Sequence, residues 1–502
     1  MTVPQAKAKS ATWGAIAFDN TYATLPDRFF ERIEPTPVAA PRLIALNDGL
    51  AQALGLDPAF LKSPEGVAIF AGNRIAEGSA PLAQAYAGHQ FGNFVPQLGD
   101  GRAVLLGEVI APSGERFDIQ LKGSGPTRFS RRGDGRAALG PVIREYVVSE
   151  AMAALGLPTT RSLAAVTSGE AVMRERMLPG GVLTRVASSH LRVGTFEYFA
   201  AREDIEGLRL LADYAISRHC PEAAKAADPY LALFEAVAAR LAELVARWMQ
   251  IGFIHGVLNT DNTSIAGETI DYGPCAFMDA YHPRKVFSSI DRQGRYAYQN
   301  QPGIVQWNVA RLGECLLPLF AGERDAVLAK ANETLGQFGT AYKVAYLAGF
   351  RRKLGLFEAH PDDEALISDL LTRMAEGGAD FTLTFRALSD AAGDTAADGS
   401  VRDLFSNKAS YDAWAFVWRE RLSREQQTPQ QRRAAMKAVN PKYIPRNHRV
   451  EAAIAAAELG QFDLFEELNR VLAKPYDDQP AFERYAAPPQ PEEEVTQTFC
   501  GT

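Results

Sequence analysis

The feature that most constrains the fold is a change in the pattern of apolar residues near residue 194. Before it, strand-like runs alternate with turns rich in glycine and proline, and after it the apolar spacing is helical. The clearest helix spans residues 231–249, where apolar side chains recur every three or four positions: Phe234, Val237, Leu241, Leu244, Val245 and Trp248. These patterns predict an α+β fold with a β-containing N-terminal part and a mainly α-helical C-terminal part.

The strongest strand signal is a pair of runs around a turn. Residues 103–110 and 116–122 are strand-like, and the Ala-Pro-Ser-Gly-Glu between them is typical of a turn. Together they predict an antiparallel hairpin. In the second run Asp118, Gln120 and Lys122 alternate with apolar residues, so the three polar side chains share one face of the strand.

The chain is long enough for several domains, but the order of these patterns favours one two-lobed unit with extensions. We expect an N-terminal extension over residues 1–80 and a β-containing N-lobe over 81–193. A helical C-lobe over 194–475 would follow. The segment 476–502 is rich in proline and acidic residues, which predicts a flexible tail.

Charge and cysteine content narrow the class of protein. The chain has 502 residues, with 53 basic and 60 acidic side chains and a net charge of −7, so a dedicated nucleic-acid binder is disfavoured. No run approaches the ~20 apolar residues of a membrane helix, and no secretory signal is recognisable. Four scattered cysteines do not form a disulfide scaffold: Cys220, Cys275, Cys315 and Cys500. We expect a cytoplasmic protein, with a monomer favoured and no membrane or nucleic-acid partner.

The strongest functional signal directly follows the 231–249 helix. His255 begins the string HGVLNTDN, which ends at Asn262, and Asp271 begins the triplet Asp-Tyr-Gly. Protein-kinase-like enzymes place H-x-D-x-x-x-x-N after a long helix and follow it with D-x-G. Asn and Asp side chains supply the hard oxygen ligands that suit Mg²⁺ on nucleotide phosphates. The spacing therefore predicts a kinase-like fold and a metal–nucleotide site at Asn262 and Asp271.

One position departs from the kinase pattern. Val257 stands where the catalytic aspartate is expected, and valine cannot accept a proton from a hydroxyl group. The ordinary kinase mechanism is therefore compromised, although Asp261 supplies a carboxylate in the same loop. Three alternatives stay open at this point: altered transfer chemistry, a kinase-like phosphotransferase, and a nucleotide-binding pseudokinase without catalysis.

Several cationic and glycine-rich segments indicate a pocket for a polyphosphate. Lys122 ends a strand, and Glu145 lies on a helix expected to begin at Pro141, so the two side chains are candidates for a phosphate-site ion pair. The turn Gly99-Asp100-Gly101-Arg102 can bring backbone N–H groups near phosphate. Further arginines surround these segments in sequence: Arg128, Arg131, Arg132, Arg136, Arg185 and Arg192.

These segments resemble a known family. The strings KGSGPTRFSRRGDGRAALGPVIREY, HGVLNTDN and IDYGPCAFMD are similar to those of the selenoprotein O (SelO/YdiU) family of protein adenylyltransferases, and the resemblance is dense over residues 80–320. It implies a kinase-like fold that binds ATP in a flipped orientation. The implied reaction transfers AMP from ATP to Ser, Thr or Tyr hydroxyls of protein substrates, with Mg²⁺, or alternatively Mn²⁺, as the metal.

The resemblance also implies roles for particular residues. Asp261 would be the catalytic carboxylate, with Asn262 and Asp271 as metal ligands and Glu145 paired to Lys122. Cys275 and Cys500 would form a redox-sensitive disulfide. The nucleotide would be bound by Gly99, Gly101, Arg102, Lys122, Asp134, Gly135, Glu145, Arg185, Arg192 and Asp271.

Overall fold

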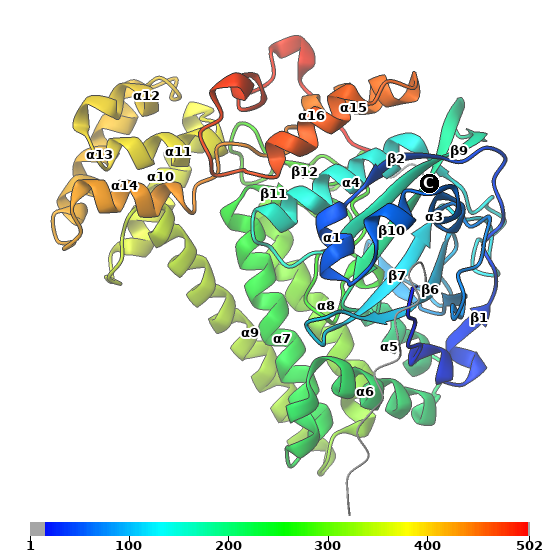
Figure 1. The fold of residues 1–502 in the computed structure, drawn as a ribbon. Helices are drawn as coiled ribbons and strands as arrows, with labels where there is room; N and C mark the ends of the chain where they lie inside the picture. The colour runs from blue at the N-terminus through cyan, green and yellow to red at the C-terminus, as the bar shows by residue number, and fades with distance from the viewer. Residues whose placement is uncertain (1–15, 500–502) are drawn as a thin grey trace, which may run out of the picture. The chain divides into compact units, whose positions relative to one another are not determined.

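The computed structural model describes residues 16–499. The chain divides into two compact units, which are described separately. Unit 1 comprises residues 16–85, Gly99–Ala138 and Ser162–Ser188, and its elements carry the blue to cyan colours of Figure 1. Unit 2 comprises Tyr86–Leu98, Leu139–Arg161 and the described residues from Ser189 onward. An antiparallel sheet in the N-terminal part and helices in the C-terminal part confirm the mixed α+β class.

Unit 1 is built on an eight-stranded sheet. Seven of its strands follow the order β1-β3-β6-β7-β10-β9-β2, and β8 pairs with β10. The predicted hairpin is confirmed, because β6 and β7 pair antiparallel with Ala103 opposite Lys122. The strands are β1 (Phe30–Arg32), β2 (Arg42–Leu46), β3 (Leu82–Gln84), β6 (Ala103–Ile110), β7 (Arg116–Lys122), β8 (Ala137–Ala138), β9 (Arg161–Met173) and β10 (Met177–Ala187). The predicted N-terminal extension thus contributes β1 and β2 to this sheet.

The two faces of β7 are both buried, but they differ in chemistry. Ile119 and Leu121 belong to an apolar core shared with the short helices α1 (Asp48–Ala53) and α3 (Pro64–Phe70). The helix α2 (Pro58–Leu61) lies between these two in the chain. The alternate residues Asp118, Gln120 and Lys122 are at most 9% exposed. Charged side chains are rarely buried without polar partners, so this face of the sheet is specialised for polar contacts.

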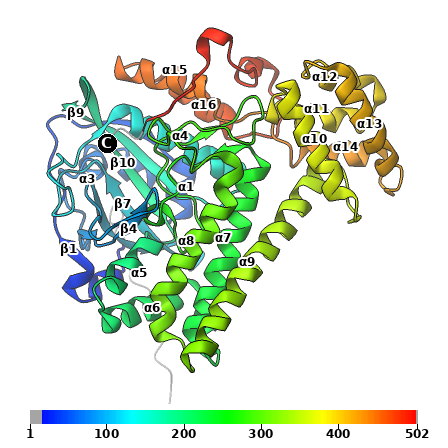
Figure 2. The same cartoon turned by 180° about the vertical axis from the view of Figure 1, so that it is seen from behind.

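Unit 2 is mainly helical. Its predicted long helix is α7 (Pro229–Gln250), which packs alongside α8 (Gln301–Leu316) and α9 (Arg324–Lys353), as both views show (Figures 1 and 2). The apolar stripe of α7 is buried as expected. The helix expected at Pro141 is α4 (Leu139–Ala154), which begins two residues earlier.

A second group of helices completes unit 2. Trp414 and Trp418 stack with ring centroids 5.3 Å apart inside one cluster, and their indole N–H groups donate to the carbonyls of Leu366 and Leu354. Two later helices, α15 and α16, pack on α4, where Tyr146 meets Phe465. The remaining helices are α5 (Val193–Ala200), α6 (Ile205–His219), α10 (Asp363–Gly377), α11 (Phe381–Ala391), α12 (Asp398–Arg402), α13 (Lys408–Leu422), α14 (Pro429–Lys437), α15 (Asn447–Glu458) and α16 (Asp463–Leu472).

The C-terminal segment makes defined contacts in unit 2 as far as residue 499. Arg446 donates to the carbonyl of Ala486. Thr498 is fully buried, its N–H donates to the carbonyl of Phe287, and its hydroxyl donates to the carbonyl of Pro274. Cys500 lies outside the described residues. None of the helices within residues 16–499 has the length and apolar content needed to cross a bilayer.

Candidate active site

The HGVLNTDN segment forms a buried loop in unit 2 between two short paired strands. β11 (Phe253–Ile254) precedes it and pairs with β12 (Ala276–Phe277), which follows the Asp-Tyr-Gly triplet. His255 is fully buried, and its Nε2 hydrogen-bonds the carbonyl of Ile270 at 2.8 Å. Burial lowers the pKa of His255, which favours the neutral ring with its proton on Nε2. This histidine ties the start of the first loop to the start of the second.

Asp261 is the acidic residue of this loop, and its carboxylate has unusual surroundings. Its carboxylate is buried, and Oδ2 accepts a hydrogen bond from Nε2 of Gln90 at 3.1 Å. Oδ1 is also buried but has no hydrogen-bond partner among residues 16–499. Burial raises the pKa of Asp261 to about 6. A buried acceptor without a donor is costly, so Oδ1 is suited to a hydrogen atom or cation that a substrate would bring.

A glycine makes room for this carboxylate. Gly88 begins β4 (Gly88–Gln90), which forms a hairpin with β5 (Asn93–Val95). A Cβ atom at Gly88 would lie 2.6 Å from Oδ1 of Asp261, closer than side chains tolerate. Any larger residue would therefore displace Asp261 or the hairpin. The backbone N–H of His89 donates to Oγ1 of Thr260 at 2.6 Å, which fixes the hairpin against the loop.

Arg192 connects the HGVLNTDN loop to the Asp-Tyr-Gly triplet. Nη1 of Arg192 donates to the carbonyl of Asp261 at 2.6 Å and to Oδ2 of Asp271 at 2.5 Å. The guanidinium also lies 4.7 Å from the ring centroid of Tyr86. Asp271 has a φ of 63°, a left-handed conformation that non-glycine residues rarely adopt. Such backbone strain often occurs at functional sites.

A second network holds the loop from the side of α5. Oε2 of Glu197 accepts from the Thr260 hydroxyl, and Oε1 hydrogen-bonds Nδ1 of His89, each at 2.5 Å. Glu197 and Thr260 are buried, so their contact is shielded from water, whereas His89 is partly exposed. Sequence reasoning missed Gln90, Thr260 and Glu197, because no motif spacing connects them. The string AYAGHQFGNF contains Gln90, and it carries no motif of fixed spacing.

Asn262 and Val257 are linked by one hydrogen bond. Nδ2 of Asn262 donates to the carbonyl of Val257 at 2.8 Å, so the amide oxygen is the atom of this side chain with the chemistry of a metal ligand. The Val257 side chain is buried. Val257, which stands where the kinase sequence pattern has its catalytic aspartate, therefore contributes to packing, and its carbonyl orients Asn262.

Unit 1 brings together a different set of the predicted residues. A Cβ at Gly99 would lie 2.4 Å from the Phe129 ring, and one at Gly101 would lie 2.8 Å from the Phe129 carbonyl oxygen. The Gly99–Arg102 turn thus packs closely on the arginine-rich loop. Asp134 in that loop pairs with Arg174, and this hydrogen-bonded arginine lowers the pKa of Asp134. Gly135 adopts a φ of 64° in the same loop.

Arg185 lies on the polar face of the unit 1 sheet. It is buried on β10 opposite Gln120 of β7, and its Nη1 lies 3.4 Å from Oε1 of Gln120. Nε2 of Gln120 donates to Asp100, which joins the glycine turn to this face. Lys122 ends β7 in unit 1, whereas the buried Glu145 lies on α4 in unit 2. Their pairing stays a prediction.

The loops of unit 2 define a class of protein. A buried carboxylate with one oxygen that lacks a hydrogen-bond partner among residues 16–499, an amide in the same loop and a second carboxylate held by Arg192 are typical of enzymes that transfer phosphorus-containing groups. Comparison with known proteins narrows this class. The family described as "Protein adenylyltransferase SelO" matches residues 14–473.

Curated relatives match nearly the whole chain. A Nitrobacter winogradskyi protein named "Protein nucleotidyltransferase YdiU" is 67% identical over 97% of this chain and 96% of its own. Proteins of the same name from Nitrobacter hamburgensis and Rhodopseudomonas palustris are 66% and 64% identical over 97% of this chain, covering 96% and 99% of theirs. The chain therefore belongs to the SelO family, a family of nucleotidyltransferase enzymes.

Proposed function

We propose that this chain transfers AMP from ATP to Ser, Thr or Tyr hydroxyls of proteins. Its family membership and the name shared by its relatives support nucleotidyl transfer to protein. The single observation that carries the proposal is the Asp261 carboxylate, which is buried and has one oxygen without a hydrogen-bond partner among residues 16–499. A proton acceptor in this condition is what a hydroxyl nucleophile requires.

The proposed reaction has one bond-forming and one bond-breaking event at phosphorus. The acceptor hydroxyl oxygen attacks the α-phosphorus of ATP, and the bond to the oxygen that bridges the α- and β-phosphates breaks. Pyrophosphate leaves with that electron pair, and Oδ1 of Asp261 takes the hydroxyl proton. Because the pKa of Asp261 is about 6, the carboxylate is largely ionised at pH 7 yet basic enough to accept the proton.

Two residues of unit 2 fit a metal ion that arrives with the nucleotide. Mg²⁺ is commonly held by one or two carboxylates together with substrate phosphates. The carboxylate of Asp271 and the amide oxygen of Asn262 have this chemistry, and the buried Oδ1 of Asp261, without a hydrogen-bond partner among residues 16–499, supports a cation or donor that arrives with the substrate. Within residues 16–499 no three His, Cys, Asp or Glu side chains form a metal-binding group by themselves. When bound, Mg²⁺ or Mn²⁺ would neutralise charge on the phosphates.

We propose that ATP is bound in a kinase-like fold but in a flipped orientation, so that the α-phosphate faces the acceptor. The resemblance in sequence supports this proposal, as does the buried polar face of β7 in unit 1. Arg192, which already bridges the two acidic loops, would stabilise negative charge as pyrophosphate leaves. The proposed nucleotide-binding residues are Gly99, Gly101, Arg102, Lys122, Asp134, Gly135, Glu145, Arg185, Arg192 and Asp271.

The proposal is tested with ATP labelled at the α- or the γ-phosphorus. α-Label on protein, lost in Asp261→Asn, supports adenylylation. γ-Label on protein would instead support a kinase-like phosphotransferase, and nucleotide binding without transfer of either label would support a pseudokinase. Asp369→Asn, which removes one partner of a surface ion pair on α10, is the matched control and should retain full transfer. Undiminished α-transfer by Asp261→Asn would contradict the assigned base.

We also propose that a disulfide between Cys275 and Cys500 regulates this enzyme. Cys275 is buried directly after Pro274, whose carbonyl accepts from the Thr498 hydroxyl, so the described end of the tail is anchored beside Cys275. Non-reducing peptide mapping should recover a 275–500 cross-link, and Cys500→Ser should lose the response of the rate to dithiothreitol. Cys220→Ser, at a buried thiol on another segment, is the control. Two free thiols under oxidising conditions would contradict the pairing.

A cytoplasmic location and a monomeric state complete the proposal. Few, scattered cysteines suit a reducing compartment, where a disulfide would form only conditionally. Cell fractionation tests the location, and light scattering of the purified chain tests the oligomeric state.

A further inference from the structure

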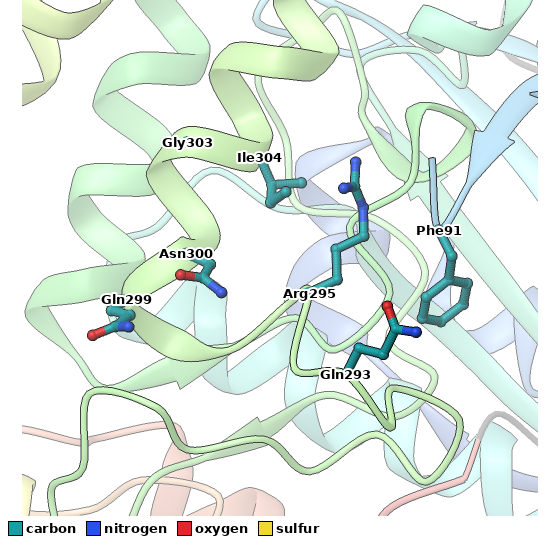
Figure 3. A pocket seen from close by; sticks show the side chains of 7 residues that line it. All are labelled: Phe91, Gln293, Arg295, Gln299, Asn300, Gly303 and Ile304. Carbon is teal, nitrogen blue, oxygen red and sulfur yellow. The ribbon is translucent and has the colours of Figure 1, made fainter. Parts of the chain in front are cut away.

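A pocket of about 540 Å³ opens in unit 2 beside the β4–β5 hairpin (Figure 3). Its size falls within the range of about 300–1,000 Å³ that is typical of ligand sites. The hairpin contributes Phe91, the segment between β12 and α8 contributes four polar residues, and the start of α8 contributes Gly303 and Ile304. The lining residues are Phe91, Gln293, Arg295, Gln299, Asn300, Gly303 and Ile304.

This pocket is connected to the catalytic loop by short polar contacts. The N–H of Phe91 lies within hydrogen-bond distance of Oδ1 of Asn259, at 3.2 Å, and of the Tyr296 hydroxyl, at 3.0 Å. That hydroxyl donates to the same Asn259 oxygen at 2.6 Å. The neighbour of Phe91 in the hairpin, Gln90, donates to Asp261. Two neighbouring residues of one hairpin, Gln90 and Phe91, therefore connect the proposed base to the pocket.

The chemistry of the pocket is dominated by Arg295. Its guanidinium lies 5.1 Å from the Trp307 ring centroid, and its Nε is buried without a hydrogen-bond partner. No carboxylate among residues 16–499 lies within ion-pair distance of this arginine. Asp291, the nearest acid in sequence, already accepts from the backbone N–H groups of Arg295 and Tyr296. An arginine held by aromatic rings and without an acidic partner is suited to a carboxylate supplied by a ligand.

The other lining groups suit a polypeptide. Gln293, Gln299 and Asn300 each carry both a donor and an acceptor, which matches the alternating N–H and C=O groups of an extended backbone. Phe91 and Ile304 offer apolar contacts for side chains, and Figure 3 shows Phe91, Arg295 and Gln293 facing the same space.

We propose that this pocket binds the segment of the acceptor protein that flanks the modified hydroxyl, and that Arg295 selects an acidic side chain in that segment. The inference rests on the proposed function, because it takes the acceptor to be a protein. It adds a binding site and a sequence preference to that function. Arg295 is a specificity-determining residue in this account and takes no part in the chemistry at phosphorus.

The test uses the full chain and short fluorescent peptides with a central Ser, Thr or Tyr. Each flanking position carries Glu, Gln or Lys in turn. Fluorescence anisotropy without ATP measures binding, and α-labelled ATP with Mg²⁺ measures transfer to the same peptides. We expect the Glu peptide to bind about tenfold more tightly than the Lys peptide at one flanking position at least, as for a partly buried charged pair.

Three variants assign the preference to Arg295. Arg295→Glu should reverse the preference between Glu and Lys peptides, and Arg295→Lys should retain most of it. Arg292→Glu is the matched control, because it makes the same charge change at an exposed arginine three residues away that does not line the pocket. It should behave like the wild type. The melting temperature of each variant verifies that it is folded.

The outcomes separate this inference from the function on which it rests. Peptides that accept α-label with no Glu preference, or with a preference that survives in Arg295→Glu, would overturn the pocket assignment and leave AMP transfer intact. An Arg295-dependent preference in binding, without transfer of α-label to any peptide, would keep the pocket and contradict the proposed reaction. Equal loss of preference in Arg292→Glu and Arg295→Glu would also overturn the assignment.

Discussion

The state of one carboxylate decides how the proposed reaction depends on pH. Asp261 sits in an environment that raises its pKa chiefly through burial, while the Gln90 hydrogen bond acts in the opposite direction. The base works only when ionised, so its activity is present above its pKa and is lost as the pH falls through that value. The Gln90 contact thus adjusts the pH range in which Asp261 is ionised.

We predict that kcat/KM for AMP transfer falls as the pH is lowered through about 6, the pKa of Asp261. Gln90→Met should move this acidic limb to higher pH, because it removes a hydrogen bond that stabilises the charged form. A pH–rate profile of both proteins measures the shift. Gln97→Met, at an exposed glutamine just beyond β5, controls for the loss of an amide. A limb that stays in place in Gln90→Met would disprove the link.

Glu197 is predicted to act as a positioning residue. Its two oxygens hold Thr260 and His89, and Glu197→Gln weakens this network because it removes the negative charge and replaces one acceptor oxygen with an NH2 group. A shifted loop would lower kcat for AMP transfer by about ten- to a hundredfold. The KM for ATP should change much less, and steady-state kinetics separates the two constants. Glu222→Gln, at an exposed site, should have no effect. An unchanged kcat in Glu197→Gln would show that the contact is dispensable.

Among the elements, α9 carries an unusual charge at its last residue. Lys353 is buried at the end of this helix, with Nζ 4.5 Å from the Phe385 ring centroid, and burial lowers its pKa to about 7. The unfolded chain holds that proton up to its ordinary pKa of 10.5. Between these two values the unfolded state binds more protons than the folded state. The free energy of unfolding must therefore rise with pH between about 7 and 10.5. Below pH 7 the fold carries the full cost of burying a charged lysine.

We predict that Lys353→Met stabilises the protein at pH 7. The pKa difference corresponds to about 4 kcal/mol of unfolding free energy at that pH, as an upper limit. The gain should shrink towards pH 10, where the wild-type lysine is already neutral in the fold. Urea unfolding at both pH values measures it. Lys330→Met, at an exposed position on the same helix, is the control. A gain that is equal at both pH values would contradict the titration of Lys353.

Elements also differ in how well the sequence predicts them. The β6–β7 hairpin and α7 were predictable, because the spacing of their apolar residues is a local pattern that extends over enough positions to be recognised. β1 and β3 have only three residues each, so their alternation is too short to detect. The packing of α15 and α16 on α4 depends on segments about three hundred residues apart, as the Arg144–Glu451 contact shows. Tertiary contacts of this kind leave no local pattern.

At the scale of the whole molecule, the candidate site was predictable only where motifs have fixed spacing. Asn262 follows from its offset from His255, Asp271 follows from the D-x-G triplet after that loop, and the role of Asp261 follows from the resemblance to the family. Gln90 touches Asp261 across 171 positions, and no spacing rule predicts such a contact. The proposed nucleotide-binding residues likewise come from both units. A binding test on the whole protein therefore decides whether the residues of the two units bind the same nucleotide.

Ligand-induced stabilisation answers that question. A ligand present at about 100 times its Kd stabilises the state that binds it by about 2.7 kcal/mol, so Mg-ATP should raise the melting temperature of the wild type. If one nucleotide uses both units, Lys122→Met in unit 1 and Asp271→Asn in unit 2 should each reduce this rise strongly at a fixed ATP concentration. Lys330→Met should keep it. A rise that one of the two variants retains in full would mean that its unit takes no part in binding ATP, because a shared ligand loses affinity when either set of contacts is removed.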